Sequence, residues 1–371
     1  MGPEDSFFRY AERIYATRRM TNSGELVVLL EERLAEMHGV RHCITFCNAC
    51  IGLMVLFEIL KERSGGSRLI MPAFTYEGLP HLARWVGLYP LFCELDPVTL
   101  TLDPISVERN MSDDVVGIVG VHQVTGTGAV TELERVARDH GKPLVFDAVY
   151  GIFESCGGVP TGGFGWAEVF SLHATKLING FEGGYITTND DGLAQWLRRI
   201  IRFGFTATDQ VSYFGINAKL NEIHAALALA SLDVVGDTLS GNRARHQWYS
   251  EHFKNVPGCS ILCNETDGPS NNCSVLLELG PGWVFGRDQV IALLKRERVL
   301  AAPFFSPPLH RPEHMPEGED VPSLPVTESV ARRFLSMPVG ELVDEDTIRR
   351  IAGLMAFMYE NQEEIAGRLA S

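Results

Sequence analysis

Short apolar runs alternate with segments of helical apolar spacing through the first two thirds of this 371-residue chain. The apolar runs have the length of buried strands rather than of helices. They lie at residues 42–46, 68–71, 89–94, 115–121 and 143–146. The segments with apolar residues three and four apart lie at 25–38, 51–62, 76–86 and 131–140. This alternation predicts an α/β domain with a mainly parallel sheet between layers of helices.

The pattern changes after Gly236, where the regular alternation ends. Helical spacing at 193–203 and 220–232 comes before this point. Beyond it, we predict a strand at 274–279 and helices at 240–256, 289–297 and 344–369, with a proline-rich stretch at 302–325. The change of texture predicts two domains, a large one over 1–236 and a smaller C-terminal α/β domain over 237–371.

Composition narrows the class of protein without indicating a reaction. Hydrophobic residues make up 45% and charged residues 21%, as in globular enzymes, and the net charge of −15 argues against a nucleic-acid partner. No apolar run approaches the roughly 20 residues of a membrane span, and the charged N-terminus is unlike a signal peptide. The eight cysteines form no zinc-type cluster with histidines, so we predict no metal site and reduced thiols in a cytoplasmic protein.

The candidate chemistry centres on Lys176, which precedes the glycine pair at 183–184. Ser171 lies five residues before the lysine, and Asp147 ends an apolar strand upstream. An amine, a hydroxyl and a strand-end carboxylate could together hold pyridoxal 5'-phosphate (PLP), with Lys176 as Schiff-base residue and Asp147 beside the pyridine nitrogen. Taken singly, Lys176 could equally be a surface lysine, and Asp147 could cap a turn.

A small-residue turn at 47–50 joins the strand at 42–46 to the following helix. Its backbone N–H groups, at Ala49 and Cys50, would suit a phosphate at a helix start, although close packing alone also favours small residues there. Tyr76 follows a strand and could stack on a cofactor ring, but aromatic residues at such positions are usually part of the core. His173 and His310 could contact a substrate or serve only as structural residues.

The order of motifs resembles the DegT/DnrJ/EryC1/StrS family of fold-type-I, PLP-dependent sugar aminotransferases. The resemblance extends over roughly residues 20–345. Its landmarks are FCNACIGL (46–53), MPAFTYEG (71–78), PLVFDAVY (143–150), FSLHATKLINGFEGGYITTND (170–190), YFGINAKLNEIHAAL (213–227), FFSPPLH (304–310) and LPVTESVARRFLSMPVG (324–340).

The resemblance implies a role for each landmark residue. It implies that Lys176 carries the cofactor and that Asp147 pairs with its pyridine nitrogen. Phosphate contacts fall to Ser171 and to the backbone at Ala49 and Cys50, ring stacking to Tyr76, and a bond to the phenolic oxygen to Tyr150. Asn217 matches an asparagine that reaches the cofactor phosphate of the neighbouring subunit, which implies a homodimer with shared active sites.

The resemblance also implies a nucleotide-linked 4-keto-6-deoxyhexose as substrate and L-glutamate as amino donor, with pyridoxamine 5'-phosphate as the intermediate cofactor form. Departures from the family pattern occur at Cys50, 123–126, Tyr150, Lys219 and Asn221. They keep open a keto-cyclitol or a non-sugar substrate in natural-product biosynthesis. A sugar dehydratase of the same fold would carry histidine in place of Lys176. A non-catalytic binding or regulatory protein would have no need for Asp147, Ser171 and Lys176 together.

Overall fold

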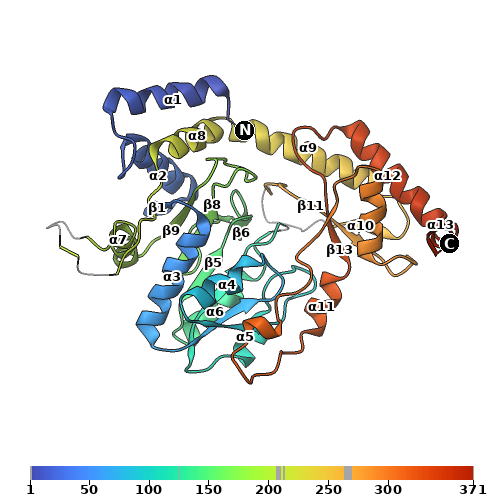
Figure 1. Ribbon diagram of the computed structural model, residues 1–371, viewed down its shortest axis with the longest axis horizontal. Coiled ribbons are helices and arrows are strands. Elements are labelled where there is room, and N and C mark those ends of the chain that lie inside the picture. Colours follow the sequence, from blue (N-terminus) through green and yellow to red (C-terminus); the bar gives the residue numbers. More distant parts are fainter. Residues whose placement is uncertain (1, 125, 206–209, 212–213, 263–269, 371) are drawn as a thin grey trace.

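A seven-stranded sheet forms the centre of the larger part of the molecule, in the order β1-β9-β8-β5-β4-β2-β3 (Figure 1). The computed structural model describes the chain except residues 1, 125, 206–209, 212–213, 263–269 and 371, so Thr125 of the 123–126 departure and Cys263 lie outside the described residues. The strands are β1 (His42–Phe46), β2 (Arg68–Pro72), β3 (Tyr89–Cys93), β4 (Val115–Val121), β5 (Leu144–Asp147), β8 (Ala167–Ser171) and β9 (Gly184–Thr188). Among the described strands of this sheet, β9 runs opposite to the other six, which confirms the mainly parallel sheet predicted.

Helices cover both faces of this sheet, as the alternating pattern predicts. The apolar sides of α3 (Ala49–Ser64), α4 (Gly78–Trp85) and α7 (Asp191–Ile200) share one core with the strands. The opposite face is covered by α2 (Glu25–His38) and α8 (Glu222–Asp233) at one end and by α5 (Pro104–Arg109) and α6 (Val130–Asp139) at the other. The N-terminal helix α1 (Glu4–Thr17) packs on α8 (Figure 1). The fold is the α/β sandwich that the sequence predicts.

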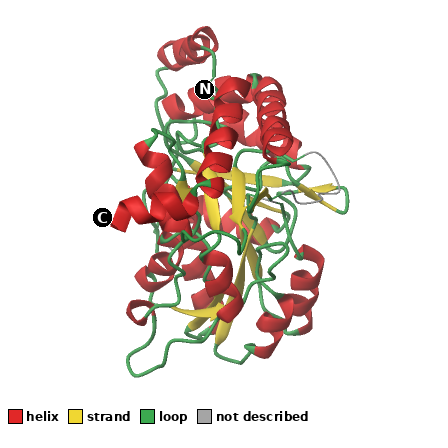
Figure 2. Cartoon of the chain, turned by 90° about the vertical axis from the view of Figure 1, so that its right-hand side faces the viewer, coloured by secondary structure: helices red, strands yellow, loops and turns green. Residues whose placement is uncertain are grey.

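A second, antiparallel sheet follows in the C-terminal third, in the order β10-β11-β13-β12. Figure 2 shows the strands in yellow, surrounded by helices in red. Its strands are β10 (Cys259–Ile261), β11 (Val275–Leu279), β12 (Ala302–Pro303) and β13 (Phe334–Met337). The long helix α9 (Val235–Phe253), together with α10 (Arg287–Arg296) and α12 (Glu345–Glu360), packs against one face of this sheet. Position 236 falls inside α9, and the domain division there stays a prediction.

Several element boundaries differ from the sequence pattern. The single terminal helix predicted at 344–369 is wrong, because α12 ends at Glu360, Asn361 is its C-cap, and α13 (Gln362–Ala370) begins after it. The Asn361 side chain donates to the Phe357 carbonyl at 2.8 Å and so competes with the helical backbone. The helix predicted at 76–86 begins only at Gly78, which leaves Tyr76 in a loop. The antiparallel strand β9 was not predicted from the sequence.

An apolar cluster joins the two sheets at the carboxyl ends of the central strands. Leu276 of β11 and Phe334 of β13 pack with Phe74, which follows β2, and with Phe304. Because this cluster ties the second sheet to the first, loops of the second sheet lie beside the strand ends where ligands of parallel sheets bind. In the described part of the chain, no single helix has the length and apolar character of a membrane span, and α8 and α9 reach that mark only when joined across a 60° bend.

Candidate active site

Asp147 lies at the carboxyl end of β5, in the middle of the central sheet. It is only 2% exposed, and its carboxylate accepts one hydrogen bond, from the Val149 N–H at 3.2 Å. Burial raises the pKa of the carboxyl to about 6, against the weaker opposing effects of that hydrogen bond and of Lys176. A buried carboxylate with so few partners is suited to receive a further hydrogen-bond donor.

Lys176 lies in the loop between β8 and β9, and its amine is close enough to Asp147 for each group to shift the pKa of the other. The amine nitrogen is 3.7 Å from the centre of the Tyr150 ring, in a cation–π contact. Burial lowers the pKa of the amine, and Asp147 and Cys273 oppose that shift. The lowered pKa increases the fraction of neutral amine, which is the nucleophilic form.

A cavity of about 210 Å³ surrounds this amine. It is lined by Val149, Tyr150, Ile152, Thr175, Lys176, Leu177, Cys273 and Ser274. Of the residues predicted from the sequence, only Lys176 and Tyr150 line it directly. Burial raises the pKa of the Tyr150 phenol to about 12, with smaller contributions from Cys273, Asp147 and Tyr76. The phenol is therefore protonated at neutral pH and can donate a hydrogen bond.

The part of the cavity wall at 273–274 belongs to the second sheet and was missed in the sequence. Cys273 had been assigned only as a reduced thiol, and the seven described cysteines are indeed free thiols. Asn271 holds this wall in place, because its side-chain amide donates to the carbonyls of Tyr150 and Ile152, each at 2.8 Å. These contacts join positions more than a hundred residues apart, so local sequence patterns carry no signal for them.

The turn predicted to bind phosphate forms the start of α3. Asn48 is the N-cap, and its side chain accepts a hydrogen bond from the Ile51 N–H at 2.9 Å. Ala49 and Cys50 are the first residues of the helix, where backbone N–H groups lack helical partners. A side chain at Gly184 would bring its Cβ within 2.5 Å of the Ala49 nitrogen. Only glycine there lets β9 approach the helix start this closely, so the turn is a tight backbone cradle suited to an anion.

Ser171 and His173 lie between this cradle and the lysine loop. Ser171 ends β8, and its hydroxyl oxygen accepts a hydrogen bond from the His173 N–H at 3.2 Å, which leaves the hydroxyl proton to donate elsewhere. The His173 ring lies 3.0 Å from the Thr175 hydroxyl and 3.7 Å from the Glu182 carboxylate. His173 therefore helps to shape the loop that carries Lys176, and it does not line the cavity.

Asn217 and Lys219 flank Ala218, whose carbonyl accepts a hydrogen bond from the Cys47 N–H at 2.7 Å, so this segment lies beside the turn at 47–50. The Lys219 amine donates to the Asn217 side-chain oxygen at 2.5 Å, and Asn217 pairs with Arg202 in an isolated β-bridge. Neither residue lines the Lys176 cavity of its own chain. Burial, followed by the nearby Arg202, lowers the pKa of Lys219.

Tyr76 and His310 lie on the loops that face the second sheet. Tyr76 is 53% exposed, close enough to Tyr150 to raise the pKa of that phenol. His310 is partly buried, and its Nε2 lies 3.3 Å from a Glu328 carboxylate oxygen. The neighbouring Leu309 N–H donates to the Ala73 carbonyl at 2.9 Å, which ties the 304–310 loop to the loop that carries Tyr76. The structure thus places His310 outside the cavity wall.

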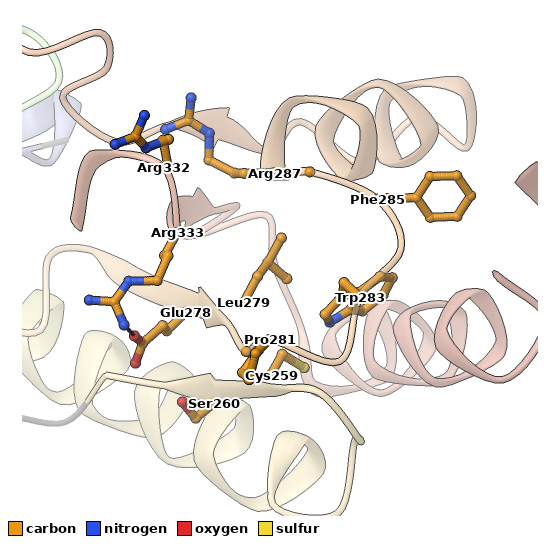
Figure 3. Close-up of a pocket in the computed structure, with 12 residues that line it drawn as sticks. Cys259, Ser260, Glu278, Leu279, Pro281, Trp283, Phe285, Arg287, Arg332 and Arg333 are labelled. Carbon is orange, nitrogen blue, oxygen red and sulfur yellow. Dashed lines mark hydrogen bonds and ion pairs between the residues drawn. The ribbon is translucent and has the colours of Figure 1, made fainter. Parts of the chain in front are cut away.

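A larger cavity, about 640 Å³, lies at the end of the second sheet (Figure 3). Its positive side chains already have protein partners. Arg333 is ion-paired with Glu278, and Arg287 contacts Asp288 at 2.7 Å, while Trp283 and Phe285 lie on the other side of the cavity. Burial raises the pKa of the Cys259 thiol in its wall to about 12, so that thiol is not a nucleophile at neutral pH. The larger cavity therefore offers less reactive chemistry than the smaller one.

The groups at the smaller cavity fit a pyridine aldehyde that carries a phosphate. The Lys176 amine, whose pKa is lowered, suits the aldehyde, and the buried Asp147 carboxylate suits a protonated ring nitrogen. The start of α3, where the first N–H groups lack helical partners, suits the phosphate. Together with the α/β sheet, these groups are typical of PLP-dependent transferases of fold type I.

Comparison with known proteins identifies the family. The model of the DegT/DnrJ/EryC1/StrS aminotransferase family matches residues 4–356, and the chain belongs to this family of PLP-dependent aminotransferases. The chain is 35% identical to a solved structure of DesI in the presence of its TDP-sugar product, with a TM-score of 0.92 over 100% of this chain and 94% of that one.

Two curated relatives are similar over most of their length. The dTDP-4-amino-4,6-dideoxy-D-glucose transaminase of Escherichia coli is 28% identical, over 94% of both chains. The GDP-perosamine synthase of Caulobacter vibrioides is 27% identical, over 91% of both chains.

Proposed function

We propose that this protein transfers the amino group of L-glutamate to a nucleotide-linked 4-keto-6-deoxyhexose, with PLP as cofactor. The observation that carries the proposal is the buried pair of Lys176 and Asp147, each of which shifts the pKa of the other, at a cavity beside a helix start. The names of the relatives support the substrate class, since they describe enzymes of nucleotide-linked amino sugars.

Each residue would have a distinct task. Lys176 would hold the cofactor aldehyde. Once a substrate amine replaces it, its Nζ would carry a proton from one carbon atom of the bound substrate and cofactor to another. Asp147 would keep the pyridine nitrogen protonated, and Tyr150 would donate its phenolic proton to the ring oxygen. The Ser171 hydroxyl and the N–H groups of Ala49 and Cys50 would hold the phosphate. When bound, PLP supplies an electron sink for the carbon that gains or loses the proton.

The same proposal includes a homodimer with shared active sites. Large apolar side chains are exposed along the segment before Asn217, at Phe203, Phe205, Val211, Phe214 and Ile216. Exposed large apolar side chains gathered on one segment are typical of protein interfaces. Asn217 lies at the end of this segment and outside its own chain's cavity, so it would reach the cofactor phosphate of the neighbouring subunit.

The function is tested by following each half of the reaction in the PLP-loaded protein. L-glutamate should change the absorption of the bound cofactor and release 2-oxoglutarate, and a nucleotide-linked 4-keto-6-deoxyhexose should then restore the starting spectrum. A panel that includes a keto-cyclitol and small keto acids separates the sugar substrate from the alternatives. Release of 2-oxoglutarate without amination of any sugar would contradict the proposed substrate, and no release at all would contradict glutamate as donor.

A further inference from the structure

The wall of the Lys176 cavity comes from three segments, and only one of them belongs to the second sheet. Residues 149–152 follow β5, and residues 175–177 belong to the lysine loop. Cys273 and Ser274 come from the residues just before β11. The second sheet therefore contributes to the surroundings of the Lys176 amine through these two small side chains alone among the described residues that line the cavity.

The backbone at Cys273 is fixed relative to the lysine loop. The Cys273 N–H donates to the Asn271 side-chain oxygen at 2.9 Å, and the amide of the same asparagine is bonded to the carbonyls of Tyr150 and Ile152. The Asn271 N–H also donates to the buried Glu154 carboxylate at 2.8 Å. Because the Tyr150 ring in turn contacts the Lys176 amine, the hydrogen bonds of Asn271 fix Cys273 relative to the segment that packs against this amine.

The Cys273 thiol has little chemistry of its own at neutral pH. Burial raises its pKa to about 11, despite the opposing effect of Lys176. A neutral thiol is a weak hydrogen-bonding group and behaves as a small apolar side chain. Its effect on a neighbouring ligand therefore comes from its size, in a cavity of only about 210 Å³.

We propose that Cys273 is a specificity-determining residue, which limits the size of the group next to the carbonyl carbon of the keto substrate. This proposal rests on the proposed function, because the carbon that is aminated must come within reach of the Lys176 amine. The substituent on the adjacent carbon then lies against the wall that Cys273 completes. A 6-deoxy sugar with the keto group at C4 places a methyl group there, and a sugar that keeps its 6-hydroxyl places a larger hydroxymethyl group there.

The first test uses the PLP-loaded protein and two nucleotide-linked 4-ketohexoses, with and without the 6-hydroxyl. We expect the wild type to prefer the 6-deoxy sugar in kcat/KM, and Cys273→Ala to reduce that preference about 10-fold. Cys273→Val should lower kcat/KM for both sugars, and for the larger sugar more strongly. Cys273→Ser keeps the size of the side chain and should keep the preference, which separates size from polarity. Cys156→Ala removes a thiol that does not line the cavity and serves as the matched control.

The second test needs neither cofactor nor substrate. Reductive alkylation of Lys176 in the cofactor-free protein, with formaldehyde or with the bulkier isobutyraldehyde, is followed by mass spectrometry of the Lys176 peptide. Cys273→Ala should raise the rate with the bulky aldehyde relative to formaldehyde, and Cys273→Val should lower it. The exposed Lys295 serves as internal control, because its two rates should be the same in every variant.

The two tests separate failure of this proposal from failure of the proposed function. If the wild type aminates neither sugar, the proposed function fails, and the aldehyde rates alone decide whether Cys273 sets the size limit. If Cys273→Ala and Cys273→Val leave the aldehyde ratio at Lys176 unchanged, Cys273 does not limit access to the amine and the proposal is overturned. An unchanged sugar preference in both variants, in an active enzyme, overturns it equally.

Discussion

Of the two cavities compared here, the larger has the less reactive side chains, and the smaller has the more reactive ones. The cavity at the end of the second sheet has about three times the volume, with about 640 Å³ against about 210 Å³ at Lys176. Its arginines Arg287 and Arg333 are paired with carboxylates; Arg287 is buried, and Arg333 is partly exposed at the surface. The smaller cavity holds an amine and adjoins a carboxyl whose pKa values are both displaced by burial.

The comparison shows why the volume of a cavity is a poor guide to a reactive site. A paired arginine at the surface has its charge satisfied, and it changes little when a ligand arrives. An amine and a carboxyl whose pKa values are shifted by burial, and which have few partners, can form new bonds with a ligand. The difference therefore favours the Lys176 cavity as the catalytic one, and variants of each cavity test that preference.

The largest effect is expected from Lys176→Ala. Removal of the amine should reduce transamination by about 10³-fold or more, because both the attachment of the cofactor and the proton transfer depend on it. The measurement is the initial rate of 2-oxoglutarate release from L-glutamate. Wild-type turnover in this variant would show that the reaction takes place elsewhere.

The next effect concerns the stability of the cofactor-free protein. Because the pKa of Asp147 is about 6 when folded and near 3.8 when exposed, the folded state binds the proton more tightly, and stability falls as pH rises from about 4 to about 6. The loss amounts to about 3 kcal/mol. Asp147→Asn cannot ionise, so at pH 7 it should be more stable than the wild type by about that amount, with little difference at pH 4. Urea unfolding at both pH values measures this difference.

Asp190 provides a control of opposite sign for that experiment. Hydrogen bonds from the Leu193 N–H and then from Trp166 lower the pKa of its carboxyl. A lowered pKa contributes stability that is lost as pH falls, so Asp190→Asn should be less stable than the wild type at pH 7 and approach it in acid. If Asp147→Asn behaved in the same way as Asp190→Asn, burial would not raise the pKa of the Asp147 carboxyl in the folded protein.

A smaller effect is expected from Asn271→Ala, which removes the contacts that hold the Cys273 wall. The loss of hydrogen bonds at a fully buried asparagine should reduce the free energy of unfolding by roughly 2 kcal/mol. Asn361→Ala, at the exposed end of α12, is the control and should change stability by much less. Equal stability of the two variants would mean that the Asn271 bonds do not anchor the wall.

The smallest effect is expected from Arg333→Met in the larger cavity. Because Arg333 is paired with Glu278 at a distance from the Lys176 cavity wall, kcat/KM should change by less than about twofold. Steady-state rates with both substrates check this. A loss comparable to that of Lys176→Ala would reverse the preference between the two cavities.

The sequence predicts the core of the site better than its rim. Asp147 and the start of α3 follow short apolar strands, and strand ends of a parallel sheet meet at one edge, so local pattern is enough to bring them together. Cys273 and Asn271 reach Lys176 only through the packing of the second sheet on the first. Contacts between residues so far apart in the sequence do not follow from local patterns of apolar and polar residues, so the sequence does not predict this part of the cavity wall.

Other misses have local causes. The strand β9 lies between two glycines and a polar turn, and its apolar run is interrupted by threonines, so its signal as a strand is weak. The break between α12 and α13 falls at Asn361, whose side chain donates to the Phe357 carbonyl, and the composition of this region does not predict a break. Asn217 carries no local pattern of a site either, and its role comes only from the resemblance to the family.

The central claim is that PLP attaches to Lys176 in the smaller cavity. Reduction of the PLP-loaded protein with borohydride, followed by peptide mass spectrometry, tests this directly. We expect a pyridoxyl mass increase on the peptide that contains Lys176, and its disappearance when L-glutamate is added before the reduction. A modification on any other lysine, or none at all in a protein that retains the cofactor, would contradict it.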